Sequence, residues 1–312
     1  MPLPTREIIE SLSKATCTDD LVNGVKNSQC ILFLGAGAHA HSPPVSAFNY
    51  PESLAPPLGA RFSTELAGKC NFAKLFPNEQ ATNLQRVAHC YELANSRNLL
   101  VKEIKSAVQV GKKPSPVLHA LARLPFSLII TTNYDDLFEK ALRAAGKNPR
   151  VGIYNKGQFN ITDDYGETGQ DEPFVFKIHG DIQHSESIVI TDEDYIQFVL
   201  RMTDKLDFHP VPETFRYHFK RWPTLFVGYS LLDYNLRLLF MTLRWNVDKT
   251  KFADMYSVDP RPDPLIFDVW SSQNKYVTFI VQDVWKFIPE LYGMVTGIDW
   301  LNDASLAKAI TG

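Results

Sequence analysis

The sequence predicts an α/β protein built on a doubly wound parallel sheet. Short, uninterrupted apolar runs such as residues 30–34 and 126–132 predict strands that are buried on both faces. Segments with a helical spacing of apolar residues separate these runs, and this alternation favours parallel strands with helices on both faces of the sheet. Because such sheets bind ligands beyond the carboxyl ends of their strands, the turns that follow the strands are the first places to look for function.

The first predicted elements are a helix or helix pair, a central strand and a long loop. Apolar residues recur at near-helical spacing from residue 5 to about residue 25. The strand at residues 30–34 follows and ends in a Gly-Ala-Gly turn. Residues 41–58 contain five prolines, Pro43, Pro44, Pro51, Pro56 and Pro57, which cannot donate backbone hydrogen bonds. We therefore expect a long loop there, of the kind that often acts as a lid.

A small helical module is expected beside the sheet, over residues 59–125. Its segments 61–66 and 81–104 have apolar residues at helical period, and their apolar faces are expected to form a core. We expect a single domain over residues 1–312, with this module inserted between the first and second strands.

Five further strands are expected after the module, each in a context of turns and helices. They are residues 126–132, 174–178, 224–230, 255–258 and 276–281. Helical patterns follow the second strand as far as Leu142, occupy residues 192–221, and cover residues 233–245. Residues 157–172 are rich in turn formers and are expected to form a surface excursion. The apolar tail from Trp285 to Tyr292 is expected to pack on the core, with an oligomer contact as the alternative.

Composition and charge exclude several classes of function. The chain has 312 residues, of which 45% are hydrophobic, and its formal net charge is -3. This charge provides no general attraction to nucleic acid or to anionic membranes, so we expect no direct nucleic-acid binding. The N-terminus lacks the pattern of a signal peptide, and no apolar run approaches the roughly 20 residues that span a bilayer. We therefore expect a cytoplasmic protein with no membrane association.

The cysteines predict neither a metal site nor disulfides. Cys17, Cys30, Cys70 and Cys90 are scattered, and no two of them have the C-x-x-C spacing typical of a structural zinc site. Buried, reduced thiols in a cytoplasmic protein are the expected alternative.

The turn after the first strand is a candidate phosphate site. Gly35, Ala36 and Gly37 would let the backbone approach a diphosphate, with amide donors from the following helix start. The third glycine of the usual dehydrogenase pattern is absent. A Gly-x-Gly turn after a strand is also common as a simple tight turn, so both interpretations stay open on these residues alone.

Asn133 and His179 are the candidate catalytic residues. Asn133 follows a strand end, where its amide could hold a ribose hydroxyl or orient a water, although it could also cap the next helix, a role open to Asp135 or Asp136 as well. His179 also follows a strand end and precedes a glycine that would allow close approach of a substrate. An imidazole there is suited to general base catalysis, although a single histidine is more often structural.

Two later strand ends supply further candidates for binding a nucleotide. Gly228 and Ser230 form a glycine turn that could present amides and a hydroxyl to phosphate or ribose oxygens. Asp259 could accept hydrogen bonds from a ribose diol, whereas an Asp-Pro pair is also typical of a plain turn.

The order of these motifs resembles the sirtuin family, and specifically the sirtuin-like domains of prokaryotic antiviral NAD hydrolases. The resemblance covers residues 30–284. It is carried by FLGAGA at 33–38, TTNYDDLFEKAL at 131–142, KIHGD at 177–181 and VGYSLLDYNLR at 227–237. It implies a Rossmann-like, sirtuin-type sheet with a small helical module.

The resemblance also implies an activity, a substrate and roles for the candidates. Gly35, Ala36 and Gly37 would cradle the pyrophosphate of NAD, Asn133 would bind the nicotinamide ribose and its water, His179 would be the base, and Gly228 and Ser230 would flank the adenosine half. Asp259 is kept as a further ribose contact. NAD would be cleaved to nicotinamide and ADP-ribose, or a cyclic isomer, in antiviral defence by NAD depletion.

The sequence departs from the deacetylating sirtuins at three places. The four-cysteine zinc module is absent, so no metal is expected and acyl-lysine chemistry is less favoured. His39 stands where those sirtuins have a serine after the glycine turn. Arg61 is a candidate for the arginine that the family carries near this point, across a proline-rich loop that aligns poorly.

Two alternatives to an NAD hydrolase remain. One is an NAD-dependent protein deacylase or ADP-ribosyltransferase, and the other is a non-catalytic module that senses NAD or ADP-ribose. The missing zinc cysteines argue against the first, while Asn133 and His179 argue against the second. Because a resting NAD hydrolase must be held inactive, we expect a homo-oligomer or control by a protein partner. The family resemblance implies a partner such as a HerA-type ATPase or an Argonaute.

Overall fold

The fold is a doubly wound α/β sheet, as the sequence predicts. The computed structural model describes residues 17–154, 168–203, 211–231, 253–271 and 277–311. Its centre is a seven-stranded parallel sheet with the strand order β3-β4-β2-β1-β5-β6-β7. The strands are β1 Ile31–Leu34, β2 Leu128–Thr131, β3 Arg150–Ile153, β4 Phe174–Lys177, β5 Thr224–Val227, β6 Met255–Val258 and β7 Val277–Ile280.

Strand β1 is the topological switch point of the sheet. It pairs with β2 on one side and β5 on the other, with Ile31 opposite both Leu128 and Thr224. From β1 the chain builds β2, β3 and β4 on one side and then β5, β6 and β7 on the other. Ligands of doubly wound sheets bind beyond the carboxyl ends of the strands at such a point. The turns after β1, β2, β4 and β5 therefore face one crevice.

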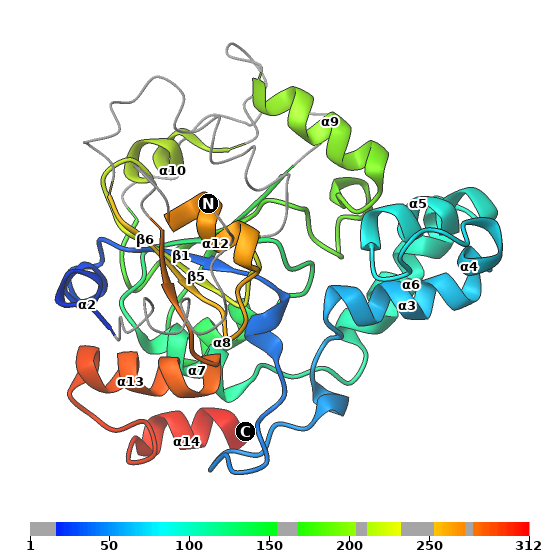
Figure 1. The fold of residues 1–312 in the computed structure, drawn as a ribbon. Helices are drawn as coiled ribbons and strands as arrows, with labels where there is room; N and C mark the ends of the chain where they lie inside the picture. The colour runs from blue at the N-terminus through cyan, green and yellow to red at the C-terminus, as the bar shows by residue number, and fades with distance from the viewer. Residues whose placement is uncertain (1–16, 155–167, 204–210, 232–252, 272–276, 312) are drawn as a thin grey trace.

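Helices cover both faces of the sheet because the strand side chains are apolar on both faces (Figure 1). One face packs on α2 Asp19–Lys26, α7 Pro116–Arg123, α8 Leu137–Ala144, α13 Val284–Thr296 and α14 Ala304–Thr311. The other face packs on α9 Asp192–Thr203, α10 Glu213–His218 and α12 Pro264–Ser271. The apolar tail at residues 285–292 is part of α13, and its packing into the first core confirms that prediction.

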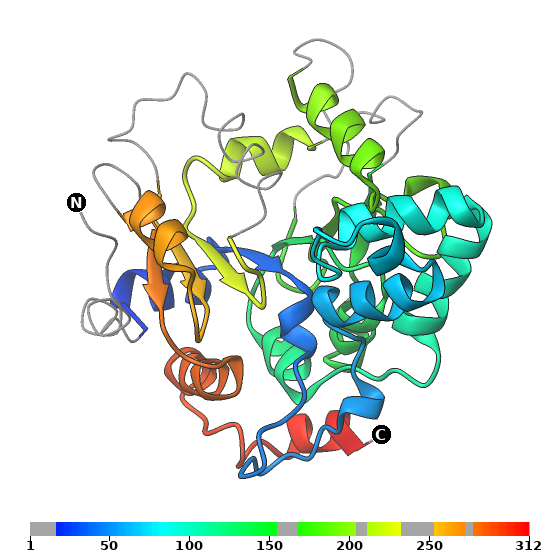
Figure 2. The same cartoon turned by 45° about the vertical axis from the view of Figure 1, so that its right-hand side comes forward.

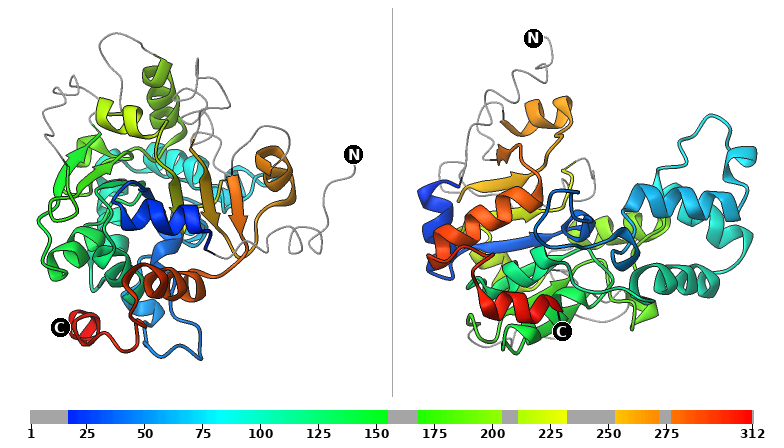
Figure 3. Two further views of the ribbon diagram at one scale, coloured as in Figure 1. Left: turned by 90° about the vertical axis from the view of Figure 1, so that its left-hand side faces the viewer. Right: turned by 90° about the horizontal axis from the view of Figure 1, so that it is seen from below.

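A group of helices projects from one side of the sheet (Figures 2 and 3). These are α3 Gly59–Lys69, α4 Phe72–Leu75, α5 Leu84–Ala94 and α6 Arg97–Gln109. They share a separate core, into which Ile182, Ile188 and Ile190 from the loop after β4 also pack. Helix α7 instead packs against α8 and α13 beside the sheet. The helical module therefore rests on the loop that follows one of the candidate catalytic residues.

The connections include three short 3-10 helices: η1 Ala36–His39, η2 Glu52–Leu54 and η3 Ser185–Ser187. Strand β3 is not among the strands predicted above. The predicted helix at 233–245, most of the segment 5–25 and most of the turn-rich segment 157–172 lie outside the described residues. Within the described ranges, no helix is both long and apolar enough to cross a bilayer.

Candidate active site

A cavity of about 370 Å³ lies beyond the carboxyl ends of the central strands. Its wall is formed by the turns after β1, β2, β4 and β5, by Pro56 and Pro57 of the long loop, and by apolar side chains of the helical module. Among the residues that the sequence singles out, the cavity is lined by Ala36, Asn133, His179, Gly228 and Ser230. The structure thus brings candidates from four separate segments to one space of a size typical of ligand sites.

The glycines after β1 and β5 are required by a close backbone contact. Gly228 has φ +67°, and a Cβ there would lie 1.9 Å from the amide nitrogen of Ala38. A Cβ on Gly35 would lie 2.5 Å from the Gly228 carbonyl oxygen, and one on Gly37 would lie 2.8 Å from the Gly228 Cα. The Gly37 amide donates to the Gly228 oxygen at 2.7 Å. Close packing between the two turns therefore explains why glycine is needed at these three positions. Their spacing in the sequence does not indicate this packing.

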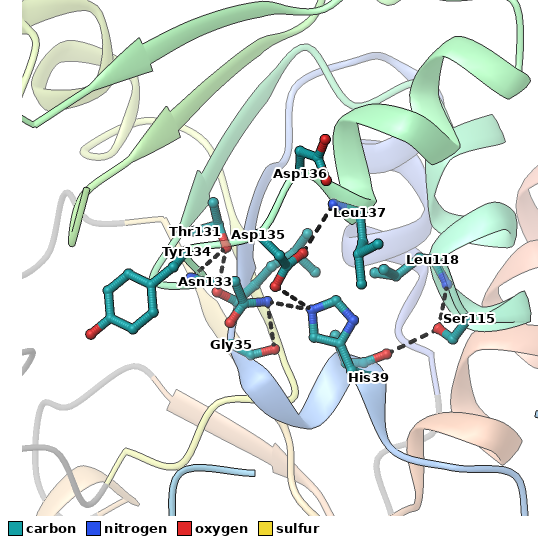
Figure 4. Close-up of polar contacts among 12 residues, drawn as sticks. Gly35, His39, Ser115, Leu118, Thr131, Asn133, Tyr134, Asp135, Asp136 and Leu137 are labelled. Atoms are coloured by element: carbon teal, nitrogen blue, oxygen red, sulfur yellow. Dashed lines mark hydrogen bonds and ion pairs between the residues drawn. The ribbon is translucent and has the colours of Figure 1, made fainter. Parts of the chain in front are cut away.

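Asn133 is held at the cavity by the turns after β1 and β2 (Figure 4). Its backbone amide donates to Thr131 Oγ1 at 3.0 Å, and its side-chain Nδ2 donates to the Gly35 oxygen at 3.3 Å. The N-cap residue of the helix that follows is Asp136, and the side chain that binds the first helical amide is Asp135, whose Oδ1 accepts from Leu137 at 3.0 Å. The Asn133 side chain is therefore not used as a helix cap, which resolves the alternative that the sequence leaves open.

A buried histidine and aspartate lie beside Asn133. His39 Nε2 is 3.3 Å from Asp135 Oδ2, and the two side chains are only 2% and 5% exposed. Burial raises the pKa of Asp135, but the charge and hydrogen bond of His39 and the charge of Lys177 outweigh burial, so this pKa lies below its ordinary value. The carboxylate is therefore ionised at neutral pH. The sequence identifies His39 only as a departure from the family pattern and gives no sign of this pair.

A buried lysine links the Asn133 loop to the end of β4. Lys177 Nζ contacts Asp181 Oδ2 at 2.5 Å and Glu139 Oε1 at 3.2 Å, and it donates to the main-chain oxygens of Tyr134 and Asp135. Burial lowers the pKa of Lys177, but the charges of Glu139 and Asp181 have the opposite and larger effect. The pKa of Lys177 therefore lies above its ordinary value. The charged ammonium thus joins the two segments that carry Asn133 and His179.

His179 lies on the cavity wall with its ring enclosed by α9. Tyr195 Oη is 3.4 Å from His179 Nδ1, and the rings of Tyr195 and Phe198 meet the imidazole edge to face. Gly180 has φ +88°, and a Cβ there would lie 2.3 Å from the Ser187 oxygen. The glycine after His179 is therefore required by the packing of its own loop, whereas the sequence suggested room for a substrate.

Three expected contacts lie away from the cavity wall, as far as the described residues define it: Gly35, Gly37 and Asp259. Asp259 follows β6, and its Oδ1 accepts from the Arg261 amide at 2.8 Å, the arrangement of a plain turn. Arg61 is also directed away, because it is 53% exposed and pairs with Glu52 and Glu65.

Tyr50, which is buried, donates to the oxygens of Leu54 and Lys113 and so holds the loop that carries Pro56 and Pro57 against the cavity.

In the part of the chain that the structure describes, no group of three His, Cys, Asp or Glu residues is placed to hold a metal ion. The four cysteines are buried and free.

A doubly wound parallel sheet with an asparagine and a histidine on one cavity at its switch point is the arrangement that the sirtuin resemblance implies. Residues 127–278 match the family model described as the SIR2-like domain. This match contains both Asn133 and His179, as well as the turn at Gly228. The chain is similar to the sirtuin-like domain family, as the motifs predict.

Several curated proteins are similar to this chain over most of its length. The chain is 30% identical over 223 residues to "NAD(+) hydrolase ThsA" of Enterococcus faecium, an alignment that covers 71% of this chain and 41% of that protein. It is 28% identical over 237 residues to "NAD(+) hydrolase ThsA" of Acinetobacter baumannii, covering 75% of this chain and 43% of the relative. With "Defense-associated sirtuin 2" of Bacillus subtilis it shares 21% identity over 252 residues, covering 80% of this chain and 22% of the relative. The chain thus spans less than half the length of these relatives.

Proposed function

We propose that this protein is an NAD hydrolase that cleaves the nicotinamide–ribose bond to give nicotinamide and ADP-ribose. The observation that carries the proposal is the presence of Asn133 and His179 on one cavity, at the ends of the neighbouring strands β2 and β4. The names of the relatives in Enterococcus and Acinetobacter support NAD as the substrate. Their names, with that of the Bacillus defence-associated sirtuin, support a role in antiphage defence by NAD depletion.

Each catalytic residue has a role that its position permits. Asn133 would hold a hydroxyl of the nicotinamide ribose or orient the attacking water, because a primary amide can donate and accept hydrogen bonds together. Departure of nicotinamide leaves an oxocarbenium-like ribose, which water captures, and His179 would accept a proton from that water or from a ribose hydroxyl. The enclosure of His179 by Tyr195 and Phe198 fixes the direction in which its ring faces the cavity.

The rest of the dinucleotide would lie along the turns at the switch point. Ala36 and the amides at the start of η1 would face the pyrophosphate, with Gly228 and Ser230 beside the adenosine half. In this proposal Gly35 and Gly37 act through the backbone contact with Gly228, which shapes the turn that the pyrophosphate meets. Asp259 would contribute only if the dinucleotide extends past β5 toward β6.

Residues 1–312 would form one sirtuin-like domain whose helical insert begins at residue 59. The sequence predicts that the insert ends near residue 125, whereas the packing of α7 beside the sheet favours an end near residue 110. The protein would act in the cytoplasm, where NAD is available, as a homo-oligomer or with a partner such as a HerA-type ATPase or an Argonaute that controls its activity.

The test is product analysis by chromatography after incubation of the purified protein with NAD. We expect nicotinamide and ADP-ribose from the unmodified protein and from His41→Ala, a variant of an exposed histidine away from the cavity wall. Asn133→Ala and His179→Ala should each lose most of the activity. A requirement for an acetyl-lysine peptide, with O-acetyl-ADP-ribose as a product, would replace this proposal with the deacylase alternative. Stoichiometric NAD binding with no product in any oligomeric state would favour the sensing module.

A further inference from the structure

Asn133, His39 and Asp135 line the cavity, and His39 contacts both of the other side chains (Figure 4). The Asn133 side-chain nitrogen is 3.0 Å from His39 Nε2, and His39 Nε2 is 3.3 Å from Asp135 Oδ2. Asp135 is two residues after Asn133 on the same loop, whereas His39 comes from the turn after β1. The imidazole therefore joins two points of the Asn133 loop to a different strand of the sheet.

The backbone that carries His39 is fixed on both sides. Ser115 Oγ donates to the Ala38 oxygen at 3.1 Å, and Trp285 Nε1 donates to the Ala40 oxygen at 3.0 Å. On the preceding turn, the Gly37 amide donates to Gly228. With the backbone held in this way and the side chain 2% exposed, the ring of His39 has little room to change its place.

The polar contacts of the ring are concentrated on its Nε2 edge. His39 Nδ1 is buried and has no hydrogen-bond partner among the described residues. Nε2 is therefore the atom through which the ring meets both neighbours: it accepts from the Asn133 side-chain nitrogen when it is unprotonated and donates to the Asp135 carboxylate when it carries a proton. The Asn133 side-chain nitrogen also donates to the Gly35 oxygen at 3.3 Å.

We propose that His39 is a positioning residue, which holds the side chain of Asn133 in the orientation that the reaction requires. The reaction itself is the one proposed above, so this inference deepens the proposed function. His39 acts through Asn133 in two ways. Its ring blocks rotation of the amide away from Gly35, and its bond to Asp135 fixes the loop that carries Asn133.

Removal of the ring should affect turnover more than binding. In His39→Ala, the Asp135 carboxylate loses its histidine partner and the Asn133 amide gains space to turn. Because misplacement of a catalytic group by about 1 Å can cost on the order of 100-fold in rate, we expect kcat to fall roughly 10- to 100-fold. The dinucleotide contacts at the other turns remain, so KM should change less than about threefold.

Two variants separate positioning from a general effect on folding. His39→Gln places an amide near the former Nε2, where it can donate to Asp135 and still contact Asn133, so we expect it to recover most of kcat. His119→Ala is the matched control, because His119 is also a buried histidine, 6% exposed, but lies on α7 and is not part of the cavity wall. It should lower the melting temperature as His39→Ala does and leave kcat unchanged.

A spectroscopic measurement tests the inference without relying on activity. In protein labelled with ¹⁵N-asparagine, the Asn133 side-chain amide signals can be identified by their loss in Asn133→Ala. We expect these signals to shift or broaden in His39→Ala and to return toward their original positions in His39→Gln. Unchanged Asn133 signals in His39→Ala, or an equal change in His119→Ala, would overturn the inference. If the unmodified protein releases no nicotinamide, the proposed function fails, and these spectra alone decide the role of His39.

Discussion

His119 gives the fold a specific sensitivity to acid. This side chain is buried on α7, and its Nδ1 has no hydrogen-bond partner among the described residues. Burial, with a smaller contribution from the charge of Arg123, lowers the pKa of His119 from 6.5 to about 4. Between these two values the unfolded chain binds a proton at His119 that the folded protein does not bind.

The magnitude follows from the linkage between proton binding and folding. Because the folded pKa is the lower one, the contribution of His119 to stability is favourable above pH 6.5 and declines as the pH falls toward 4. At pH 5, protonation of the unfolded chain lowers the free energy of unfolding by about 2 kcal/mol, compared with about 0.2 kcal/mol at pH 7. The loss over this interval is a large fraction of the stability of a typical domain.

The perturbation is His119→Met, which removes the titrating group and keeps an apolar side chain of similar size. The assay is urea unfolding of both proteins at pH 7 and pH 5. We expect the decrease in unfolding free energy between the two pH values to be about 2 kcal/mol smaller in the variant, since the other titrating groups are shared. His41→Gln, at an exposed histidine, should behave as the unmodified protein does. Equal decreases in His119→Met and the unmodified protein would refute the assignment of acid sensitivity to His119.

Three further predictions concern the cavity. Gly228→Ala should abolish most nicotinamide release and lower the free energy of unfolding by roughly 2–4 kcal/mol, because the added Cβ would collide with Ala38. Gly146 is the control position, because it has φ +82° but no atom within 4 Å of an added Cβ. In the same urea titration, Gly146→Ala should show only the backbone strain of about 1 kcal/mol. Lys177→Met should lower the free energy of unfolding by roughly 3–5 kcal/mol, since it leaves buried carboxylates unpaired, and a loss under 1 kcal/mol would contradict the importance of this contact. Tyr195→Phe should reduce kcat several-fold with KM and stability nearly unchanged; an unaltered kcat would show that its hydroxyl does not orient His179.

The strands that are buried on both faces were predictable because they are continuous apolar runs. Residues 30–34 and 126–132 contain β1 and β2, and both strands are fully buried. Strand β3 is different, because it lies at the edge of the sheet and its four residues include a glycine and an arginine. The burial there is incomplete, so no run of apolar residues marks β3 in the sequence.

The candidate site was predictable only where a residue follows a strand directly. Asn133 and His179 lie on the cavity because strand ends meet at one edge of a parallel sheet. The partners of these residues depend on contacts across the sequence, such as His39 with Asp135 and Tyr195 with His179. In the sequence, Lys177 is a single charged residue at the end of an apolar strand, and nothing in the local pattern indicates Glu139 or Asp181 as its counterions.

The loop after β4 connects the helical module to His179, the candidate catalytic histidine. Ile182, Ile188 and Ile190 of this loop are part of the module core, while the loop begins directly after His179. Arg97 of α6 also binds the Ile188 oxygen and Asp194, so the module and the loop are joined by both apolar packing and hydrogen bonds. A displacement of the module relative to the sheet would therefore reach His179 through its own backbone. Protein docking on the outer surface of the module could in this way change catalysis from a distance, with no ligand entering the cavity.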